Sequence, residues 1–398
     1  MWMPCSMIIG PRPVAKLGRE EGELRALGAL WTATEIAQQG AMLRKTQAGL
    51  AARKEALERF LFPLIHRTDM RVILAGAGTS SFIGECLAPY VAAKLPCRVE
   101  AIATTDLVSA PALYFEADEP TLLISFGRSG NSPESVAALD LAEQLVREIH
   151  QLAITCNPEG ELARRIARTG NGVTILLPEE TNDRSFAMTS SFSSMTWAGL
   201  AALCGIDGMG ARVDCVASAI DAVIATQAAA MRSLAARSYE RVVYLGSHIF
   251  KGLAREAALK LLELTDGGVI ALPDSPMGFR HGPKTIVNAG TLVVIFLCND
   301  VYTRRYDLDL LQEIARDGKA AGVLAICGCD KDLPPGIGKI TIPNMAEARD
   351  IELLLPFIAA PQMFAFEAAI DRGLAPDNPN KSGTVNRVVQ GVRIHPLR

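Results

Sequence analysis

Two short hydrophobic segments from the first half of the chain recur in the second half at a common spacing. RVILAG at 71–76 matches RVVYLG at 241–246, and TLLISF at 121–126 matches TLVVIF at 291–296, so both pairs are about 170 residues apart. LAIT at 152–155 is echoed by LAIC at 324–327, two residues away from that spacing. Because a common offset preserves the distance between segments, the repeat predicts two copies of one folding unit.

Short apolar runs alternate with amphipathic stretches from Arg71 onward. Uniformly apolar strands that alternate with helices are typical of a parallel sheet covered on both faces, so we expect an α/β fold with two doubly wound sheets. In the first copy, strands are expected at 71–75, 98–103, 121–125, 150–155 and 173–177. Helices are expected at 81–95 and from about Pro133, Glu159 and Ala187.

The repeat and the composition of its flanks divide the chain into four expected parts. These are an N-terminal helical arm (1–65), a first copy (66–215), a second copy (216–375) and a C-terminal tail (376–398). In the arm, helical spacing of apolar residues predicts helices at 35–47 and 48–65, with Thr32 or Thr34 as an N-cap. The start of the chain lacks a charged segment before its apolar residues and is not expected to be a secretory signal.

Composition excludes several functional classes. The chain is 49% hydrophobic and 21% charged, with a formal net charge of -3, which argues against a disordered protein and against a basic nucleic-acid-binding surface. No run approaches the length of a membrane-spanning helix, so no membrane partner is expected. Nine cysteines, an odd number, lie mostly in apolar runs and indicate a reduced, cytoplasmic protein. Cys327 and Cys329 have no second pair and no nearby histidine, so no metal site is predicted.

Two loops of the first copy combine glycine with small hydroxyl residues at expected strand ends. Residues 76–81 read GAGTSS and residues 127–134 read GRSGNSPE, whereas the second-copy equivalent of SFGRSG at 125–130 is IFLCND at 295–300. Glycines let backbone amides approach an anion, and a following helix N-terminus favours negative charge. We therefore expect an anion such as phosphate in the first copy. Ordinary tight turns and N-caps are the alternative, and neither loop matches a nucleotide-binding motif.

A helix expected in the second copy carries Glu256, Lys260 and Glu263 on one face. An exposed ion pair is the common explanation for such a pattern. The flanking residues are nearly all Ala and Leu, however, which points to burial and therefore to a site. The next loop places His281 between Arg280 and the turn Gly282-Pro283, at the end of an expected strand.

Several longer motifs resemble one known family. The chain resembles tandem sugar isomerase (SIS) domains, as in the isomerase half of glucosamine-6-phosphate synthase, and resembles the AgaS group most. That group is described as tagatose-6-phosphate ketose/aldose isomerases or galactosamine-6-phosphate deaminase/isomerases. The motifs are SFGRSGNSPESV, DRSFAMTSS, DSPMGFRHGPK, YTRRYDLDLL and GTVNRVVQGV, which begin at residues 125, 183, 274, 302 and 383.

The resemblance assigns roles to residues of this sequence. It implies that the sugar phosphate is bound by Ser80, Arg128, Ser129 and Ser132, in a loop shaped by Ser125 and Gly127. Weaker substrate contacts are expected from Thr79, Thr189, Ser190, Glu256 and Arg280. Glu263 is implied as the base that moves a proton between C1 and C2, aided by Lys260, and His281 as the group that assists ring opening, from the same or a neighbouring subunit. Lys381 is a weaker candidate, for which a surface lysine without a role is the alternative.

The family resemblance implies a deaminase that converts D-galactosamine 6-phosphate to tagatose 6-phosphate and ammonia. It implies a small-molecule phosphosugar substrate, no metal, no organic cofactor and a homodimer or higher homo-oligomer. A simple aldose–ketose isomerase would use the same proton transfer and stays open. A non-catalytic phosphosugar sensor also stays open, although such a protein would not need Glu263 and His281.

Overall fold

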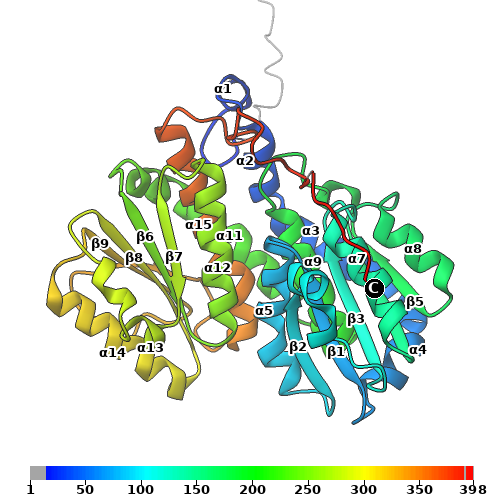
Figure 1. The fold of residues 1–398 in the computed structure, drawn as a ribbon. Coiled ribbons are helices and arrows are strands. Elements are labelled where there is room, and N and C mark those ends of the chain that lie inside the picture. The colour runs from blue at the N-terminus through cyan, green and yellow to red at the C-terminus, as the bar shows by residue number, and fades with distance from the viewer. Residues whose placement is uncertain (1–14, 390, 398) are drawn as a thin grey trace, which may run out of the picture.

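The computed structural model describes residues 15–389 and 391–397, and the expectation for the start of the chain lies outside them (Figure 1). The N-terminal arm is helical, as predicted, but its described part forms four helices rather than the two expected at 35–47 and 48–65. Its helices are α1 (Glu21–Ala26), α2 (Leu30–Ala37), α3 (Gln39–Ala52) and α4 (Lys54–Ile65).

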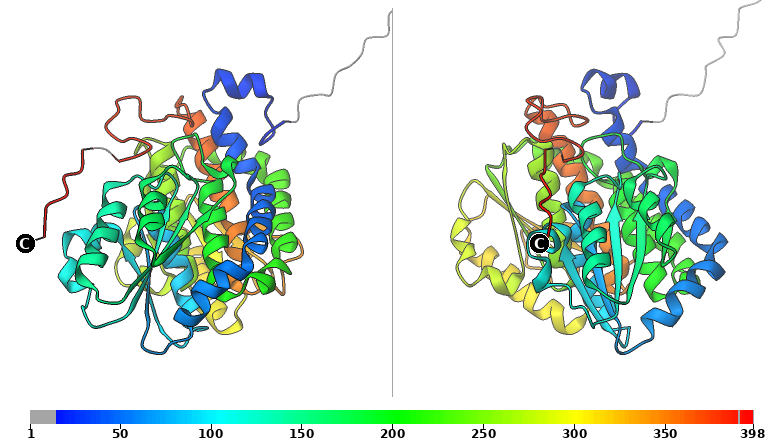
Figure 2. Two further views of the ribbon diagram at one scale, coloured as in Figure 1. Left: turned by 90° about the vertical axis from the view of Figure 1, so that its right-hand side faces the viewer. Right: turned by 45° about the vertical axis from the view of Figure 1, so that its right-hand side comes forward.

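The predicted N-cap of the arm is wrong. Thr32 and Thr34 lie inside α2, because Asp377 from the C-terminal segment accepts hydrogen bonds from the backbone amides of Trp31 and Thr32 at 3.1 and 2.8 Å. A carboxylate distant in sequence thus supplies the acceptor that a local cap residue would otherwise provide. Figure 2 shows the first N-terminal helices and the start of the C-terminal segment near each other at one end of the molecule.

The first copy forms a five-stranded parallel sheet in the order β2-β1-β3-β4-β5. Every strand expected there is present, and two helices start slightly later than expected, at Glu161 and Ser190. The strands are β1 (Arg71–Gly76), β2 (Arg98–Ala103), β3 (Thr121–Gly127), β4 (Ile149–Thr155) and β5 (Gly172–Leu176). The helices are α5 (Thr79–Ala92), α6 (Thr104–Ser109), α7 (Pro133–Leu145), α8 (Glu161–Thr169) and α9 (Ser190–Cys204).

The second copy repeats this topology in a sheet of order β10-β9-β8-β6-β7, which is the same order read from its other edge. The strands are β6 (Arg241–Gly246), β7 (Ile270–Asp274), β8 (Thr291–Leu297), β9 (Gly322–Cys327) and β10 (Gly338–Thr341). Helices α10 (Ile206–Gly210) and α11 (Val213–Ala235) connect the two sheets. The helices that follow are α12 (Ile249–Leu264), α13 (Pro276–Phe279), α14 (Val301–Asp317) and α15 (Asp350–Asp371). The predicted α/β fold with two tandem units is confirmed, while the exact domain boundaries stay a prediction.

Both faces of each sheet are buried. In β1, Val72 and Leu74 face a core that also contains Val242 and Tyr244 of β6, so one hydrophobic core joins the two copies. Alternate residues such as Ile73 face a separate core on the outside of the sheet. This double burial explains why the strands are uniformly apolar rather than alternating. In Figure 1 the two sheets lie on opposite sides of a central layer of helices.

Helices α5 and α12 pack closely where the two copies meet. A Cβ atom on Gly252 would lie 2.8 Å from the backbone nitrogen of Cys86, so a larger residue would push the helices apart. Arg255 of α12 forms an ion pair with Glu85 of α5 at 2.5 Å on the rim of this contact. Because α12 carries the predicted acid–base residues and α5 follows the first glycine loop, this packing sets their relative position.

Two described helices, α11 and α15, meet the length and apolarity expected of a membrane span. The most apolar part of α15 is 94% buried within the protein, and α11 packs along α15. Their apolar surface therefore contributes to the central helical layer.

We expect Gly252→Ala to destabilise the protein by about 1–3 kcal/mol, because the added methyl group meets backbone atoms that cannot rotate away. Gly49→Ala, at an open position in the last turn of α3, is the matched control and should be neutral or stabilise by up to about 1 kcal/mol. Calorimetric unfolding of both variants measures the difference. Equal stabilities would contradict a tight α5–α12 contact.

Candidate functional site

A cavity of about 200 Å³ lies where the carboxyl end of the first sheet faces α12. Four parts of the chain form its walls: the two glycine loops of the first copy, the segment before α9 with Phe186 and Met188, Glu263 of α12 and a C-terminal segment. The lining residues are Ala77, Gly78, Thr79, Ser80, Phe126, Gly127, Arg128, Ser129, Gly130, Ser132, Ser135, Phe186, Met188, Glu263 and residues 385–389. The structure therefore brings most of the predicted phosphate residues together with the predicted base.

The first loop connects β1 to α5 through a turn that only small residues permit. A Cβ atom on Gly76 would lie 2.5 Å from the backbone of Ser80, and Gly78 adopts a φ of +56° at the N-cap of α5. These constraints place Thr79 and Ser80 in the first turn of α5, where the helix dipole favours an anion.

The second loop connects β3 to α7 and is held by its own serines. Ser132 is the N-cap of α7 and accepts a hydrogen bond from the Ser135 amide at 3.4 Å, and Ser129 Oγ accepts one from the Asn131 amide at 3.2 Å. The N-cap explanation considered for this loop is thus correct for Ser132. The same two serines also line the cavity, so the cap and the candidate site coincide.

Arg128 places a buried positive charge at the cavity. Its guanidinium donates hydrogen bonds to three backbone carbonyls, those of Ser185, Phe186 and Arg387, at 3.3, 3.2 and 2.9 Å. It has no carboxylate ion-pair partner in the part of the chain that the structure describes. Burial, followed by the nearby charge of Arg387, lowers the pKa of Arg128 to about 10. A buried cation bonded only to neutral oxygens is suited to an anionic ligand.

Three other predicted residues lie beside the cavity without lining it. Ser125 is buried within β3, and its hydroxyl has no hydrogen-bond partner among the described residues. Thr189 and Ser190 belong to the start of α9, where Asp183 accepts hydrogen bonds from the Thr189 amide at 2.8 Å and from the Ser190 hydroxyl at 2.5 Å. Their polar groups stabilise the wall of the cavity.

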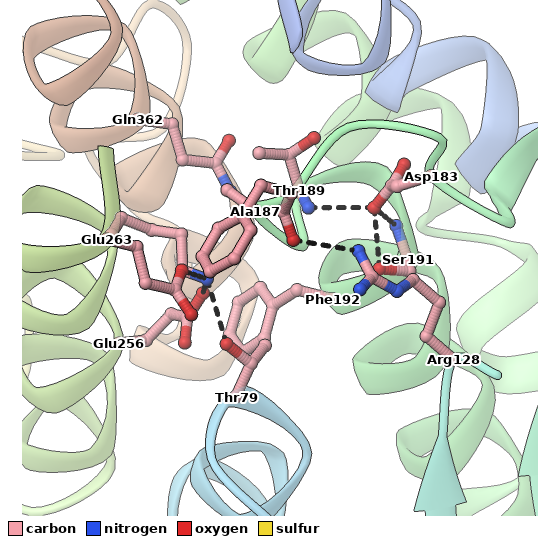
Figure 3. A network of polar contacts seen from close by, with 12 residues as sticks. Thr79, Arg128, Asp183, Ala187, Thr189, Ser191, Phe192, Glu256, Glu263 and Gln362 are labelled. Carbon is pink, nitrogen blue, oxygen red and sulfur yellow. Dashed lines mark hydrogen bonds and ion pairs between the residues drawn. The ribbon is translucent and has the colours of Figure 1, made fainter. Parts of the chain in front are cut away.

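The three charged residues of α12 form a buried cluster. Glu256 and Lys260 are fully buried, so the alternative of an exposed ion pair is wrong for them. Lys260 Nζ donates to Thr79 Oγ1 at 3.0 Å, forms an ion pair with Glu263 and lies 3.6 Å from Glu256 Oε1. Figure 3 shows both glutamates on α12 directed toward Thr79 of α5, with Arg128 across from them.

The cluster holds one positive charge between two carboxyl groups in a dry environment. Burial lowers the pKa of Lys260, but the charges of Glu256 and Glu263 outweigh it and raise this pKa overall. Burial raises the pKa of Glu256 to about 8, against the opposing effect of Lys260. Lys260 therefore stays charged and Glu256 is largely protonated at neutral pH. Glu263 is the member of the cluster that lines the cavity.

Three predicted residues lie away from this cavity. His281 follows α13 at the end of β7 and is exposed. Arg280 lies 3.0 Å from Glu313 of α14 in an ion pair, and Lys381 is an exposed residue of the tail. None of the three lines the cavity of its own chain.

The corresponding crevice of the second copy is filled by the chain's own carboxylates. Asp307 accepts a hydrogen bond from the Cys298 amide at 3.1 Å, and Asp350 accepts one from the Asn299 amide at 2.5 Å. Cys298 and Asn299 are the equivalents of Arg128 and Ser129 at the 170-residue offset. The amides that could face an anion are therefore already bonded in this copy.

A His–Cys–Asp cluster also lies in the second crevice. The donor atoms of His248, Cys298 and Asp350 lie within 4.8 Å of one another. However, His248 Nδ1 accepts a hydrogen bond from the Ile249 amide at 2.7 Å, which places the proton of a neutral imidazole on Nε2. Nε2 faces Asp350 at 3.3 Å, and burial raises the pKa of the Cys298 thiol. The geometry is that of a hydrogen-bonded cluster rather than of metal ligands.

Sequence reasoning missed several residues of the site. Phe186 and Met188 line the cavity, Asp183 and Glu35 hold the segment that carries them, and Arg387 comes from the tail. The motifs DRSFAMTSS and GTVNRVVQGV contain four of these five residues. The family motifs therefore mark these segments, although they assign no role to the individual residues.

We expect one phosphate to bind per chain, in the first copy. Arg128→Met should weaken the binding of inorganic phosphate by about tenfold or more, because it removes the buried charge. Cys298→Ser, at the equivalent position of the second copy, should leave affinity and stoichiometry unchanged. Isothermal titration measures both quantities, and two sites per wild-type chain would contradict the difference between the copies.

The ionisation of Glu256 should make stability fall as pH rises. The pKa of this buried group is about 8 in the folded protein, against an ordinary value of 4.5. The folded state therefore binds the proton more tightly, and this contribution is lost as pH rises from about 4.5 to about 8. We expect Glu256→Gln to raise the melting temperature more at pH 8.5 than at pH 5, as measured by calorimetry. The opposite pH dependence would show that Glu256 is an ionised partner of Lys260.

Comparisons with known proteins identify the family of this chain. The SIS domain family model matches residues 64–204. The chain is 46% identical to an AgaS protein of Streptomyces coelicolor over 93% of this chain and 96% of that protein. It is 44% identical to the D-galactosamine-6-phosphate deaminase AgaS of Escherichia coli over 92% and 96% of the two chains. The solved structure of a tagatose-6-phosphate ketose/aldose isomerase from Escherichia coli is 41% identical and covers 92% of this chain and 96% of that one, with a TM-score of 0.86. The chain therefore belongs to the AgaS group of the SIS-domain family.

Proposed function

We propose that this protein is a phosphosugar enzyme that converts D-galactosamine 6-phosphate to tagatose 6-phosphate and ammonia. The observation that carries the proposal is the single cavity in which the two glycine loops and Arg128 face Glu263. An anion-binding end and a carboxylate base opposite it suit a sugar phosphate whose reacting carbons lie far from its phosphate group.

The phosphate would bind at the first turn of α5 and the loop before α7, with Arg128 supplying the buried charge. In the open-chain substrate, Glu263 would remove the proton from C2, and the electron pair would form the C1–C2 double bond. The electrons of the C1 carbonyl would move to O1, which takes a proton, and the product is an enolamine. The same carboxyl group would return the proton to C1 and leave an imine at C2. Water would then add to C2 and release ammonia, which gives the ketose. One carboxylate therefore transfers the proton between adjacent carbons.

Lys260 and Glu256 would tune this base. The Lys260 ammonium forms an ion pair with Glu263 and holds its carboxyl group in place, and Thr79 Oγ1 accepts a second bond from the same ammonium. Since Glu256 is largely protonated at neutral pH, the cluster does not place a second full negative charge beside the developing enolamine.

The family resemblance assigns ring opening to His281, which does not line the cavity of its own chain. If His281 has this role, it must come from a neighbouring subunit, since it lies outside the cavity of its own chain. The proposal therefore includes a homodimer or higher homo-oligomer. The eight described cysteines are all free thiols, which supports a reducing compartment such as the cytoplasm.

A simple aldose–ketose isomerase is the second candidate. It would use the same proton transfer without loss of nitrogen, and the Escherichia coli structure is described by that activity. A non-catalytic sensor is less consistent with the site, because a buried lysine between two carboxyl groups is costly and adds nothing to phosphate binding.

The deciding experiment measures ammonia release from galactosamine 6-phosphate, with glucosamine 6-phosphate and N-acetylated forms in parallel. Galactosamine 6-phosphate should release ammonia and yield tagatose 6-phosphate. Glu263→Gln should lower kcat by about 10²–10⁴-fold, because it removes the base while keeping the shape of the side chain. Phosphosugar affinity should change little in this variant.

Glu116→Gln is the matched control, since Glu116 is exposed near the amino end of β3. It should have wild-type activity. Exchange of aldose and ketose without ammonia would identify the isomerase, and binding without either reaction would identify a sensor.

A further inference from the structure

A segment near the C-terminus, which forms no helix or strand, crosses the cavity on the side of the glycine loops. We call residues 385–389 the C-terminal strap, since all five line the cavity. Residues 381–386, which include the start of the strap, are exposed, and their hydrogen bonds join them mainly to one another, as from Asn386 to the Gly383 carbonyl. The strap is therefore held in place by few contacts.

One residue provides the polar contacts between the strap and the rest of the protein. Arg387 Nε donates to the Asp183 carbonyl at 2.9 Å, and Nη2 donates to Asn182 Oδ1 at 3.1 Å. The Arg387 carbonyl in turn accepts the 2.9 Å bond from Arg128. Every hydrogen bond that the structure describes between the strap and residues before 372 involves Arg387.

Two positive charges therefore meet at this end of the cavity. Arg128 is buried, Arg387 is half-buried, and neither has a carboxylate ion-pair partner within the described ranges. The charge of Arg387 adds to burial in lowering the pKa of Arg128, so the two guanidinium groups destabilise each other. A doubly charged anion between or beside them would remove this cost.

We propose that Arg387 is a positioning residue that holds the C-terminal strap over the cavity, and that a bound phosphate group stabilises this closed arrangement. The inference deepens the proposed function, because it assigns part of the phosphosugar site to the tail. Without an anion, repulsion between the two guanidinium groups opposes closure. With an anion, both charges favour it.

The test uses inorganic phosphate and trypsin cleavage after Lys381, an exposed residue four positions before the strap. Phosphate should slow this cleavage in the wild-type protein. Arg387→Gln should abolish the protection and weaken phosphate binding by about 10- to 100-fold, since it removes a charged hydrogen-bonding group. Arg387→Lys keeps the charge but not the paired bonds, and should give intermediate values.

Arg393→Gln is the matched control, because Arg393 is an exposed residue beyond the strap and does not line the cavity. It should behave as wild type in both measurements. Arg387→Gln should keep the wild-type melting temperature, because the strap adds little to the core. In turnover it should raise KM much more than it lowers kcat, a split that loss of the fold would not produce.

The outcomes separate this inference from the proposed function. Unchanged phosphate affinity and unchanged protection in Arg387→Gln would overturn the inference and leave the proposed reaction standing. Protection that depends on Arg387, in a protein that releases no ammonia from any amino sugar, would support the strap and overturn the deaminase.

Discussion

The ammonium of Lys260 determines how the two halves of the site fit together. It is fully buried on α12 of the second copy, and it reaches both Glu263 on its own helix and Thr79 on α5 of the first copy. A buried charge requires partners, so the contact fixes the position of one half relative to the other. The close approach of α5 and α12 at Gly252 makes this reach possible. The phosphate loops and the base are therefore held at one distance by packing and charge together.

The two copies share one backbone fold but differ in charge at the equivalent loop: the first copy leaves a cavity beside Arg128, and the second copy places carboxylates there. Gly78 and His248, about 170 residues apart, both adopt positive φ at the N-cap of the equivalent helix. In the first copy this conformation costs little, and the cavity beside it remains open. In the second copy the histidine side chain caps its own helix, and Asp307 and Asp350 occupy neighbouring amides. The backbone strain of the positive φ at His248 is offset by the hydrogen bonds that its side chain forms in this cluster.

The sequence predicts the repeated part of this fold well, for a physical reason. Strands buried on both faces must be apolar throughout, so β1, β3, β6 and β8 are visible as runs at one offset. The burial of Lys260 also follows from its Ala and Leu neighbours. The sequence predicts poorly what depends on distant partners. Asp377 replaces the expected N-cap of α2, and Asp183 accepts hydrogen bonds from the Thr189 amide and the Ser190 hydroxyl. Arg387 belongs to the motif GTVNRVVQGV, but its bonds to Asn182 and Asp183, which are distant in sequence, cannot be read from that motif.

The wall that carries Phe186 and Met188 explains why so many polar residues surround the cavity without entering it. Glu35 accepts hydrogen bonds from the amides of Arg184 and Ser185, and Asp183 accepts those of Thr189 and Ser191, so carboxylates fix both ends of the segment. Burial and the charge of Asp183 raise the pKa of Glu35 to about 7. The carbonyls of the same segment are thereby turned toward Arg128. The net charge of -3 is compatible with an anionic substrate because these carboxylates bond to amides and hydroxyls behind the wall, whereas the guanidinium groups lie at the cavity.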